Sequence, residues 1–174
     1  MKNTKNAKKL TMCAVMISLA LALNYLERFI PLQLLIPLPG IKLGLANIVT
    51  LVALYMLDAK SAVTILVIRC LMGSMFGGGV TGLLFSLTGG MLAIVTMILA
   101  SKCKCFSVYG VSILGAGAHN VGQICASMVL MQSVYIGAYL PYLLIVSLFT
   151  GFATGSCAGG IIRIFRISGG KRPK

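Results

Sequence analysis

The sequence has almost no acidic residues and no tryptophan. Only 2 of its 174 residues are Asp or Glu, against 15 Lys or Arg, and charged residues of both signs make up 10% of the chain. Soluble domains carry about 25% charged residues. Residues 106–162 contain no Lys, Arg, Asp or Glu, so the basic residues are not spread as on a nucleic-acid-binding surface. These absences exclude a soluble domain, a nucleic-acid partner and a disordered basic protein.

The shortage of carboxylates also argues against catalysis. An enzyme that joins or cleaves diphosphates needs clustered carboxylates to hold magnesium, and we expect Glu27 and Asp58 on opposite sides of a bilayer. The single histidine, His119, has no acidic residue at its expected depth, and neither a Gly-x-Ser-x-Gly turn nor a phosphate-binding loop is present. We therefore expect no catalytic residue and no cofactor, so this chain is not predicted to be an enzyme.

The six cysteines do not predict a disulfide framework. Four of them lie in apolar runs, and Cys103 and Cys105 lie on the side expected to face the reducing cytoplasm. The Cys-x-Cys pair has no second pair and no histidine at a ligand spacing. We expect no metal site.

Apolar residues, in contrast, make up 59% of the chain, and its mean hydropathy is +1.02. A membrane-spanning helix needs about 20 predominantly apolar residues. The chain is therefore predicted to be an all-α integral membrane protein, a single membrane domain over residues 1–174 built as a bundle of six transmembrane helices. The predicted spans cover approximately residues 10–30, 42–57, 61–76, 82–100, 106–131 and 142–162, with a basic tail over 163–174. Pro31, Pro37 and Pro39 indicate a loop between the first two spans.

The basic residues are concentrated on alternate sides of the predicted spans. Most of them fall before the first span, in the second and fourth connections and in the tail, as the positive-inside rule requires of cytoplasmic segments. An odd number of spans would break this alternation. The pattern therefore predicts a multi-pass protein of the cell membrane with both termini in the cytoplasm.

Polar side chains inside the predicted spans are candidates for a binding site, because burying them in a bilayer costs free energy. Arg69 is the costliest and needs a counter-ion, and Glu27 is the one carboxylate in the outer half. Arg28 and Lys42 add positive charge at the same mouth. We expect an anionic small-molecule ligand, with these candidate binding residues: Asn24, Glu27, Lys42, Asn47, Arg69, His119, Asn120 and Gln123.

Purely structural roles are equally open for several of these residues. Arg69 could form an internal ion pair with Glu27 or cap carbonyl groups, and His119 could be a hydrogen-bonded packing residue. Two strips of small residues also have two interpretations, packing within the bundle or contact with a partner helix. One strip is Gly151, Gly155 and Gly159, and the other is Ala14, Ser18 and Ala22.

The segment Pro39-Gly40-Ile41-Lys42-Leu43-Gly44-Leu45-Ala46-Asn47-Ile48, followed by Gly73, Gly77 and Gly82, resembles the Gx transporter family. That family is also labelled heptaprenyl diphosphate synthase component I and is similar to the S components of energy-coupling factor transporters. The resemblance implies an S-component-like six-helix bundle that captures a small molecule from outside. It also implies a transmembrane coupling subunit, contacted through Ala14, Ser18 and Ala22, and two cytoplasmic ATPases.

Two functions follow from these observations. The first is a noncatalytic substrate-binding subunit for uptake of a small anionic molecule, energised by a partner ATPase module. The second is a noncatalytic membrane accessory subunit of isoprenoid or quinone biosynthesis, or of flavin-linked electron transfer. Transport requires an outer pocket around the polar residues, whereas the accessory role requires a contact with a separate enzyme.

Overall fold

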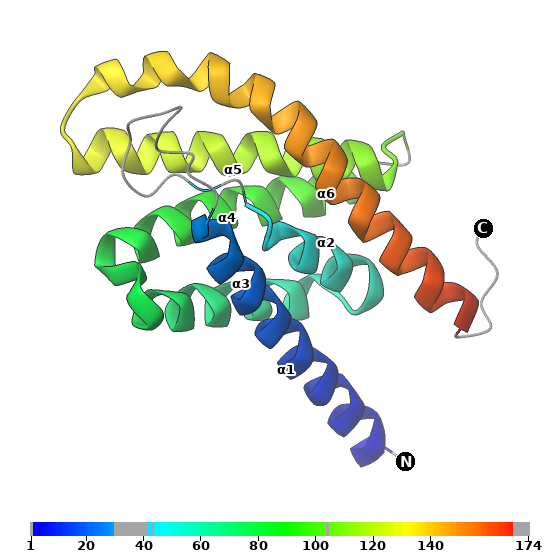
Figure 1. Ribbon diagram of the computed structural model, residues 1–174. Helices are drawn as coiled ribbons and strands as arrows, with labels where there is room; N and C mark the ends of the chain where they lie inside the picture. The colour runs from blue at the N-terminus through cyan, green and yellow to red at the C-terminus, as the bar shows by residue number, and fades with distance from the viewer. Residues whose placement is uncertain (1, 30–41, 43, 104, 169–174) are drawn as a thin grey trace.

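The computed structural model describes residues 2–29, 42, 44–103 and 105–168, and Figure 1 shows them as a bundle of α-helices. No strand occurs in these residues. The helices are α1 (Lys2–Leu26), α2 (Asn47–Met56), α3 (Ala59–Gly73), α4 (Gly79–Lys102), α5 (Val108–Leu130) and α6 (Leu140–Ser168). Short helical turns connect or extend them: η1 (Glu27–Phe29), η3 (Ser74–Gly78) and η4 (Val134–Tyr139). The all-α prediction is confirmed for this part of the chain.

Five helical segments in the described residues are long and apolar enough to cross a membrane. They are residues 6–26, 59–77, 79–102, 108–130 and 134–165, which overlap five of the six predicted spans. The exception is the predicted span 42–57, where α2 has ten residues and a length of about 15 Å, half the thickness of the hydrocarbon core. The described residues therefore form six α-helices, and five helical segments, one of which joins α3 to η3, are long enough to span a membrane.

Gly44 explains why α2 begins late. Its φ is +82°, a left-handed conformation that glycine adopts without steric cost and other residues rarely adopt. The turn after it is closed by a hydrogen bond from the Asn47 N–H to the Gly44 carbonyl, 2.8 Å long, and the helix starts there. The sequence pattern of apolar residues alone does not reveal this interruption.

The helices α4, α5 and α6 pack at very short distances because glycines line their contacts. A Cβ atom on Gly122 of α5 would lie 2.8 Å from the Cα of Gly89 on α4. A Cβ atom on Gly151 of α6 would lie 2.6 Å from the Cα of Ile113 on α5. Gly155 faces α5 as well, so internal packing is the interpretation that fits the glycine strip of α6.

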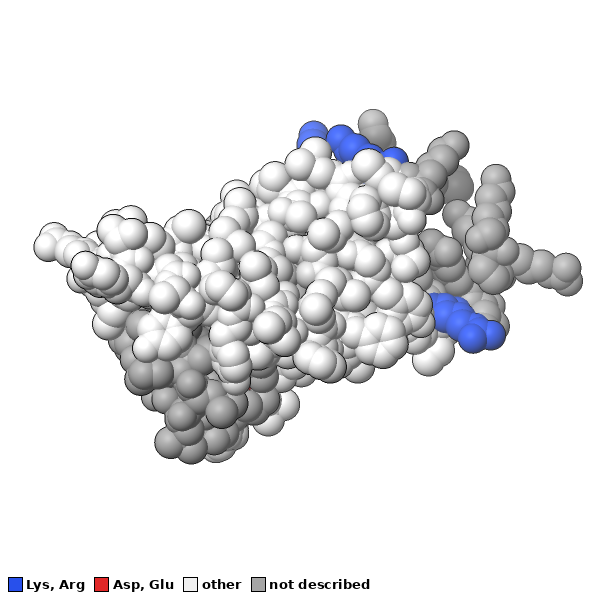
Figure 2. All heavy atoms as spheres, turned by 90° about the horizontal axis from the view of Figure 1, so that it is seen from above, with Lys and Arg blue, Asp and Glu red and all other residues white. Residues whose placement is uncertain are grey.

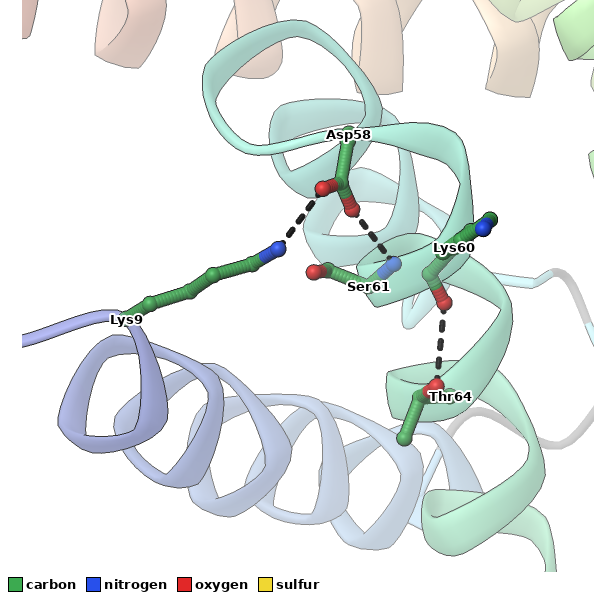
Figure 3. Close-up of polar contacts among 5 residues, drawn as sticks. All are labelled: Lys9, Asp58, Lys60, Ser61 and Thr64. Carbon is green, nitrogen blue, oxygen red and sulfur yellow. Dashed lines mark hydrogen bonds and ion pairs between the residues drawn. The ribbon is translucent and has the colours of Figure 1, made fainter. Parts of the chain in front are cut away.

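One end of the bundle, here called the basic end, collects most of the described lysines and arginines, which lie at helix termini. In the view of Figure 2 these side chains gather toward one end, and the length of the molecule beside them is uncharged. Figure 3 shows the contact that fixes this end. Asp58 caps the start of α3 by accepting from the Ser61 N–H at 2.7 Å, and it accepts from Lys9 Nζ of α1 at 2.7 Å.

Candidate functional site

Six of the helical elements bring polar side chains together in the half of the bundle away from the basic end. We call this group the polar cluster. Most of its side chains are almost fully buried, and Lys42 is half-buried. The polar cluster consists of Asn24 of α1, Glu27 of η1, Lys42, Asn47 of α2, Arg69 of α3, Ser86 of α4, and His119 and Gln123 of α5.

Arg69 projects from α3 into the cluster and is 5% exposed. Its Nη2 donates to Asn47 Oδ1 at 3.1 Å, whereas its Nε is buried without a hydrogen-bond partner in the described structure. A buried donor with no acceptor costs about 1–3 kcal/mol. The Nε–H of Arg69 is therefore a vacant, directional donor inside the cluster.

Glu27 does not form an ion pair with Arg69, which was one of the structural alternatives for that residue. The described part of the chain contains one ion pair, and it joins Lys9 to Asp58. Glu27 instead accepts a short hydrogen bond from the Gly44 N–H and interacts with Lys42 and Arg69 electrostatically at longer range. The left-handed turn at Gly44 directs its N–H toward the carboxylate, which the sequence could not indicate.

Lys42 connects three helices. Its Nζ donates to Asn24 Oδ1 of α1 at 3.1 Å and to Ser86 Oγ of α4 at 3.3 Å. Its main chain pairs with the side-chain amide of Gln123 on α5. In the amide orientation that satisfies every partner, the Gln123 oxygen accepts from the Lys42 N–H at 3.2 Å and the nitrogen donates to the Lys42 carbonyl at 3.2 Å.

His119 lies one turn before Gln123 on the same face of α5. Its Nε2 donates to the Gln123 oxygen at 3.1 Å, which assigns the proton of the neutral ring to Nε2. Its Nδ1 lies against Gly89 of α4, where a Cβ atom would approach within 2.9 Å. His119 is therefore a packed, hydrogen-bonded residue that orients Gln123.

Asn120 is the predicted site residue that lies elsewhere. Its Nδ2 donates to the Leu143 carbonyl of α6 at 2.9 Å, so it joins α5 to α6 and does not face the cluster. Successive residues of a helix are turned by about 100°, and the contact with Gln123 and His119 uses the other face. Ser86 is the cluster residue that the sequence analysis missed, because a serine in an apolar helix carries no distinguishing signal.

The two carboxylates of the chain lie at opposite ends of the bundle. Asp58 contacts Lys9 near the start of α1, and Glu27 follows directly after the end of α1. At 1.5 Å per residue, Lys9 and Glu27 are about 27 Å apart along the helix axis. The described residues also contain no group of three or more His, Cys, Asp or Glu side chains that could hold a metal ion. This arrangement provides no pair of carboxylates for binding magnesium.

The small residues of α1 face outward. Met16, Ala20 and Asn24 form its buried face, one turn apart from each other. The predicted partner-contact residues lie on the opposite, exposed face, and they are Ala14, Ser18 and Ala22. This strip therefore does not serve the packing of the described bundle.

A groove of about 610 Å³ lies between α4 and α5, and it is lined almost entirely by apolar atoms. Leu92, Val95 and Val129 lie along it, and Thr88 and Gly122 lie at its base. The close contact between Gly122 and Gly89 separates this groove from the polar cluster, because Gly89 faces His119 on its other side. The groove and the cluster are thus two distinct features.

The chain matches the model of a known protein family. Residues 16–161 match the family model described as heptaprenyl diphosphate synthase component I. No curated protein and no solved structure matches the chain. The matched region includes all of α2 to α5 and every residue of the polar cluster.

Proposed function

This chain belongs to the heptaprenyl diphosphate synthase component I family, and we propose that it is a noncatalytic membrane subunit that binds a small anionic molecule in the polar cluster for uptake into the cell. The observation that carries the proposal is the Arg69 guanidinium. It is 5% exposed, retains a vacant donor at Nε, and forms no ion pair with Glu27. A buried cation with a free donor is a site for an oxyanion, since charge-assisted hydrogen bonds to such groups are the strong ones.

The noncatalytic role is supported by the family description and by the carboxylates. The family is described as a component of a synthase, which is compatible with a subunit that assists a separate enzyme. Glu27 and Asp58 are too far apart to share a metal ion. We therefore assign to this chain the capture of a molecule and no chemical step.

Uptake needs a source of energy outside this chain, because the sequence has no phosphate-binding loop. We propose a transmembrane coupling subunit that contacts the exposed strip Ala14, Ser18 and Ala22, together with cytoplasmic ATPases. Small residues at such a face let another helix approach closely. The basic end is then the cytoplasmic end, with both termini in the cytoplasm and the polar cluster toward the outer surface of the cell membrane.

The test is mass spectrometry of the gently purified protein, recording copurifying small molecules and subunits together. We expect a stoichiometric anion together with a coupling subunit and ATPases. Arg69→Leu should lose the anion, and Arg163→Leu, which removes the same charge from an exposed position, should retain it. If Arg69→Leu retains a stoichiometric anion, the ligand does not bind at the polar cluster and the proposal fails.

The groove between α4 and α5 favours a second candidate, a noncatalytic accessory subunit of isoprenoid metabolism. Its apolar lining and volume of about 610 Å³ suit the hydrocarbon chain of a prenyl compound rather than an anion. This role predicts copurification of a soluble prenyl synthase with no stoichiometric small anion. That result would contradict the uptake proposal and support the accessory role.

A further inference from the structure

We propose that the ligand of the polar cluster carries a single negative charge, as a monocarboxylate does, and is not a diphosphate. This inference rests on the proposed binding role of the cluster and specifies the chemical class of the ligand. It follows from the balance of charges among the buried side chains and from the position of one unused donor.

Three of the charged side chains that the structure describes lie in the cluster. Lys42 and Arg69 are cations, and Glu27 is a carboxylate that accepts the Gly44 N–H and interacts with both cations. His119 adds no charge, because its Nε2 carries the proton donated to Gln123 and its Nδ1 lies against the backbone of Gly89. Asp58 lies about 27 Å away, as measured along α1. The cluster therefore has a net charge of about +1 when it is empty.

An uncompensated charge in an apolar interior is costly, whichever its sign. A monoanion brings the cluster to neutrality, whereas a diphosphate, with two or more negative charges at neutral pH, leaves an excess of negative charge beside Glu27. The mismatch is therefore as unfavourable with a diphosphate bound as it is in the empty cluster. Neutrality thus selects a ligand with one negative charge.

The vacant donor agrees with this selection. The Nη2 of Arg69 donates to Asn47 Oδ1 at 3.1 Å, and its Nε is a buried donor without a partner in the described structure. One carboxylate oxygen is sufficient to satisfy it.

The experiment compares probes that differ in charge, using the full chain purified in detergent at neutral pH and constant ionic strength. The probes are benzoate, phthalate, which adds a second carboxylate to the same ring, and inorganic pyrophosphate. The midpoint of thermal unfolding is recorded against probe concentration. We expect saturable stabilisation by benzoate at a concentration about tenfold lower than that needed for phthalate or pyrophosphate.

Two variants test the charge balance itself. Glu27→Gln keeps an oxygen for the Gly44 N–H, raises the net charge of the cluster by one unit and should reverse the preference toward phthalate. Lys42→Met lowers the net charge by one unit and should remove the response to benzoate. Lys60→Met removes the same charge from an exposed position and should leave the response unchanged. If Glu27→Gln does not fold, the different responses of Lys42→Met and Lys60→Met to benzoate test the charge balance.

A wild-type preference for phthalate or pyrophosphate would overturn this inference and leave the binding role standing. A copurified ligand with two or more negative groups would do the same. Absence of any saturable response to the three probes would also overturn it, and the copurification experiment decides separately whether the cluster binds an anion at all.

Discussion

The side-chain amide of Gln123 pairs with the main chain of Lys42, 81 positions earlier in the sequence, through two hydrogen bonds of 3.2 Å. Gln123 has no exposed surface, and the same amide oxygen accepts from His119. One side chain thus holds the segment before α2 against α5. The geometry resembles the pairing of two peptide groups, in which both a donor and an acceptor are satisfied.

Replacing Gln123 by Leu should destabilise the protein. The Lys42 N–H, the Lys42 carbonyl and the Nε2 of His119 would lose their partner, and each buried unsatisfied group costs about 1–3 kcal/mol. We expect a loss of at least about 2 kcal/mol in the free energy of unfolding in detergent. Asn6→Leu removes an amide from an exposed position of α1 and should change stability little. Equal stability of the two variants would contradict the pairing.

Replacing Arg69 by Leu should separate binding from folding. The substitution removes a buried cation that makes one side-chain hydrogen bond, at 3.1 Å to Asn47, and forms no ion pair. The loss of an unpaired buried charge removes its desolvation cost, and one acceptor, Asn47 Oδ1, loses its donor, so we expect a small change in the unfolding midpoint while binding of the copurified anion is lost. Unfolding of the variant in mild detergent would show that Arg69 has a structural role.

Replacing Gly44 by Ala should be costly for two reasons. The φ of +82° strains any residue with a Cβ atom, and that atom would lie 2.8 Å from Nδ2 of Asn47 and 3.1 Å from Cδ2 of His119. We expect a loss of about 1–3 kcal/mol. Gly160 provides the matched control, because it lies in α6 with no heavy atom within 4 Å of its Cβ position. Gly160→Ala should stabilise the helix slightly, by about 0.5–1 kcal/mol.

The contact between Asp58 and Lys9 should make stability depend on pH in the acid range. The hydrogen bond from Lys9, and next those from Ser61, hold the pKa of the Asp58 carboxyl well below its usual value of 3.8. Because the folded-state pKa is depressed, the stabilisation is fully present above pH 3.8 and is lost as the pH falls through the folded-state pKa. Both side chains are nearly half exposed, so the effect should be small and weaken with salt.

Asp58→Asn measures this contribution, since Asn is as good an N-cap as Asp and removes the charge alone. At neutral pH and low salt the wild type should unfold at a higher temperature than the variant. The difference should shrink as the pH falls below 3.8. A difference that stays constant over the whole pH range would mean that the ion pair does not form.

A bulky residue on the exposed strip of α1 should leave the isolated protein stable and should weaken its contact with the proposed coupling subunit. Ser18→Phe places a ring on the outward face, where the described bundle leaves it exposed. We expect an unchanged unfolding midpoint and reduced copurification of the coupling subunit. Ile145→Phe at an exposed position of α6 is the control and should not affect copurification. Equal recovery of the subunit with both variants would place the contact elsewhere.

Much of the fold follows from the sequence because apolar length is a strong signal. The ends of α4 and α5 lie within a few residues of the predictions 82–100 and 106–131. The predicted span 42–57 is the exception, since the turn at Gly44 depends on a backbone conformation that composition does not specify. Short helices next to turns are where hydropathy is least informative.

The candidate site was predicted in part. Buried polar residues at one depth do converge, because Asn24, Asn47 and Arg69 come from three helices that pack together. Their partners could not be predicted from the sequence. Asn120 faces α6, although its neighbour His119 faces the cluster. Arg69 donates a hydrogen bond to the amide of Asn47, whereas the sequence offers Glu27 as a carboxylate partner. Which polar group meets which depends on helix rotation, and apolar periodicity does not fix it.

The way α1 is held has a consequence for how the bundle assembles. Of the most apolar stretch of α1, 17% is buried, against 44% for α4 and for α5. Polar contacts hold α1 near both ends, at Lys9 with Asp58 and at Asn24 with Lys42. Because lipid solvates an apolar helix as well as protein does, the bundle formed by the later helices loses little apolar packing when α1 detaches. In the described structure α1 is therefore held to the bundle less by apolar packing than by side-chain contacts near its two ends.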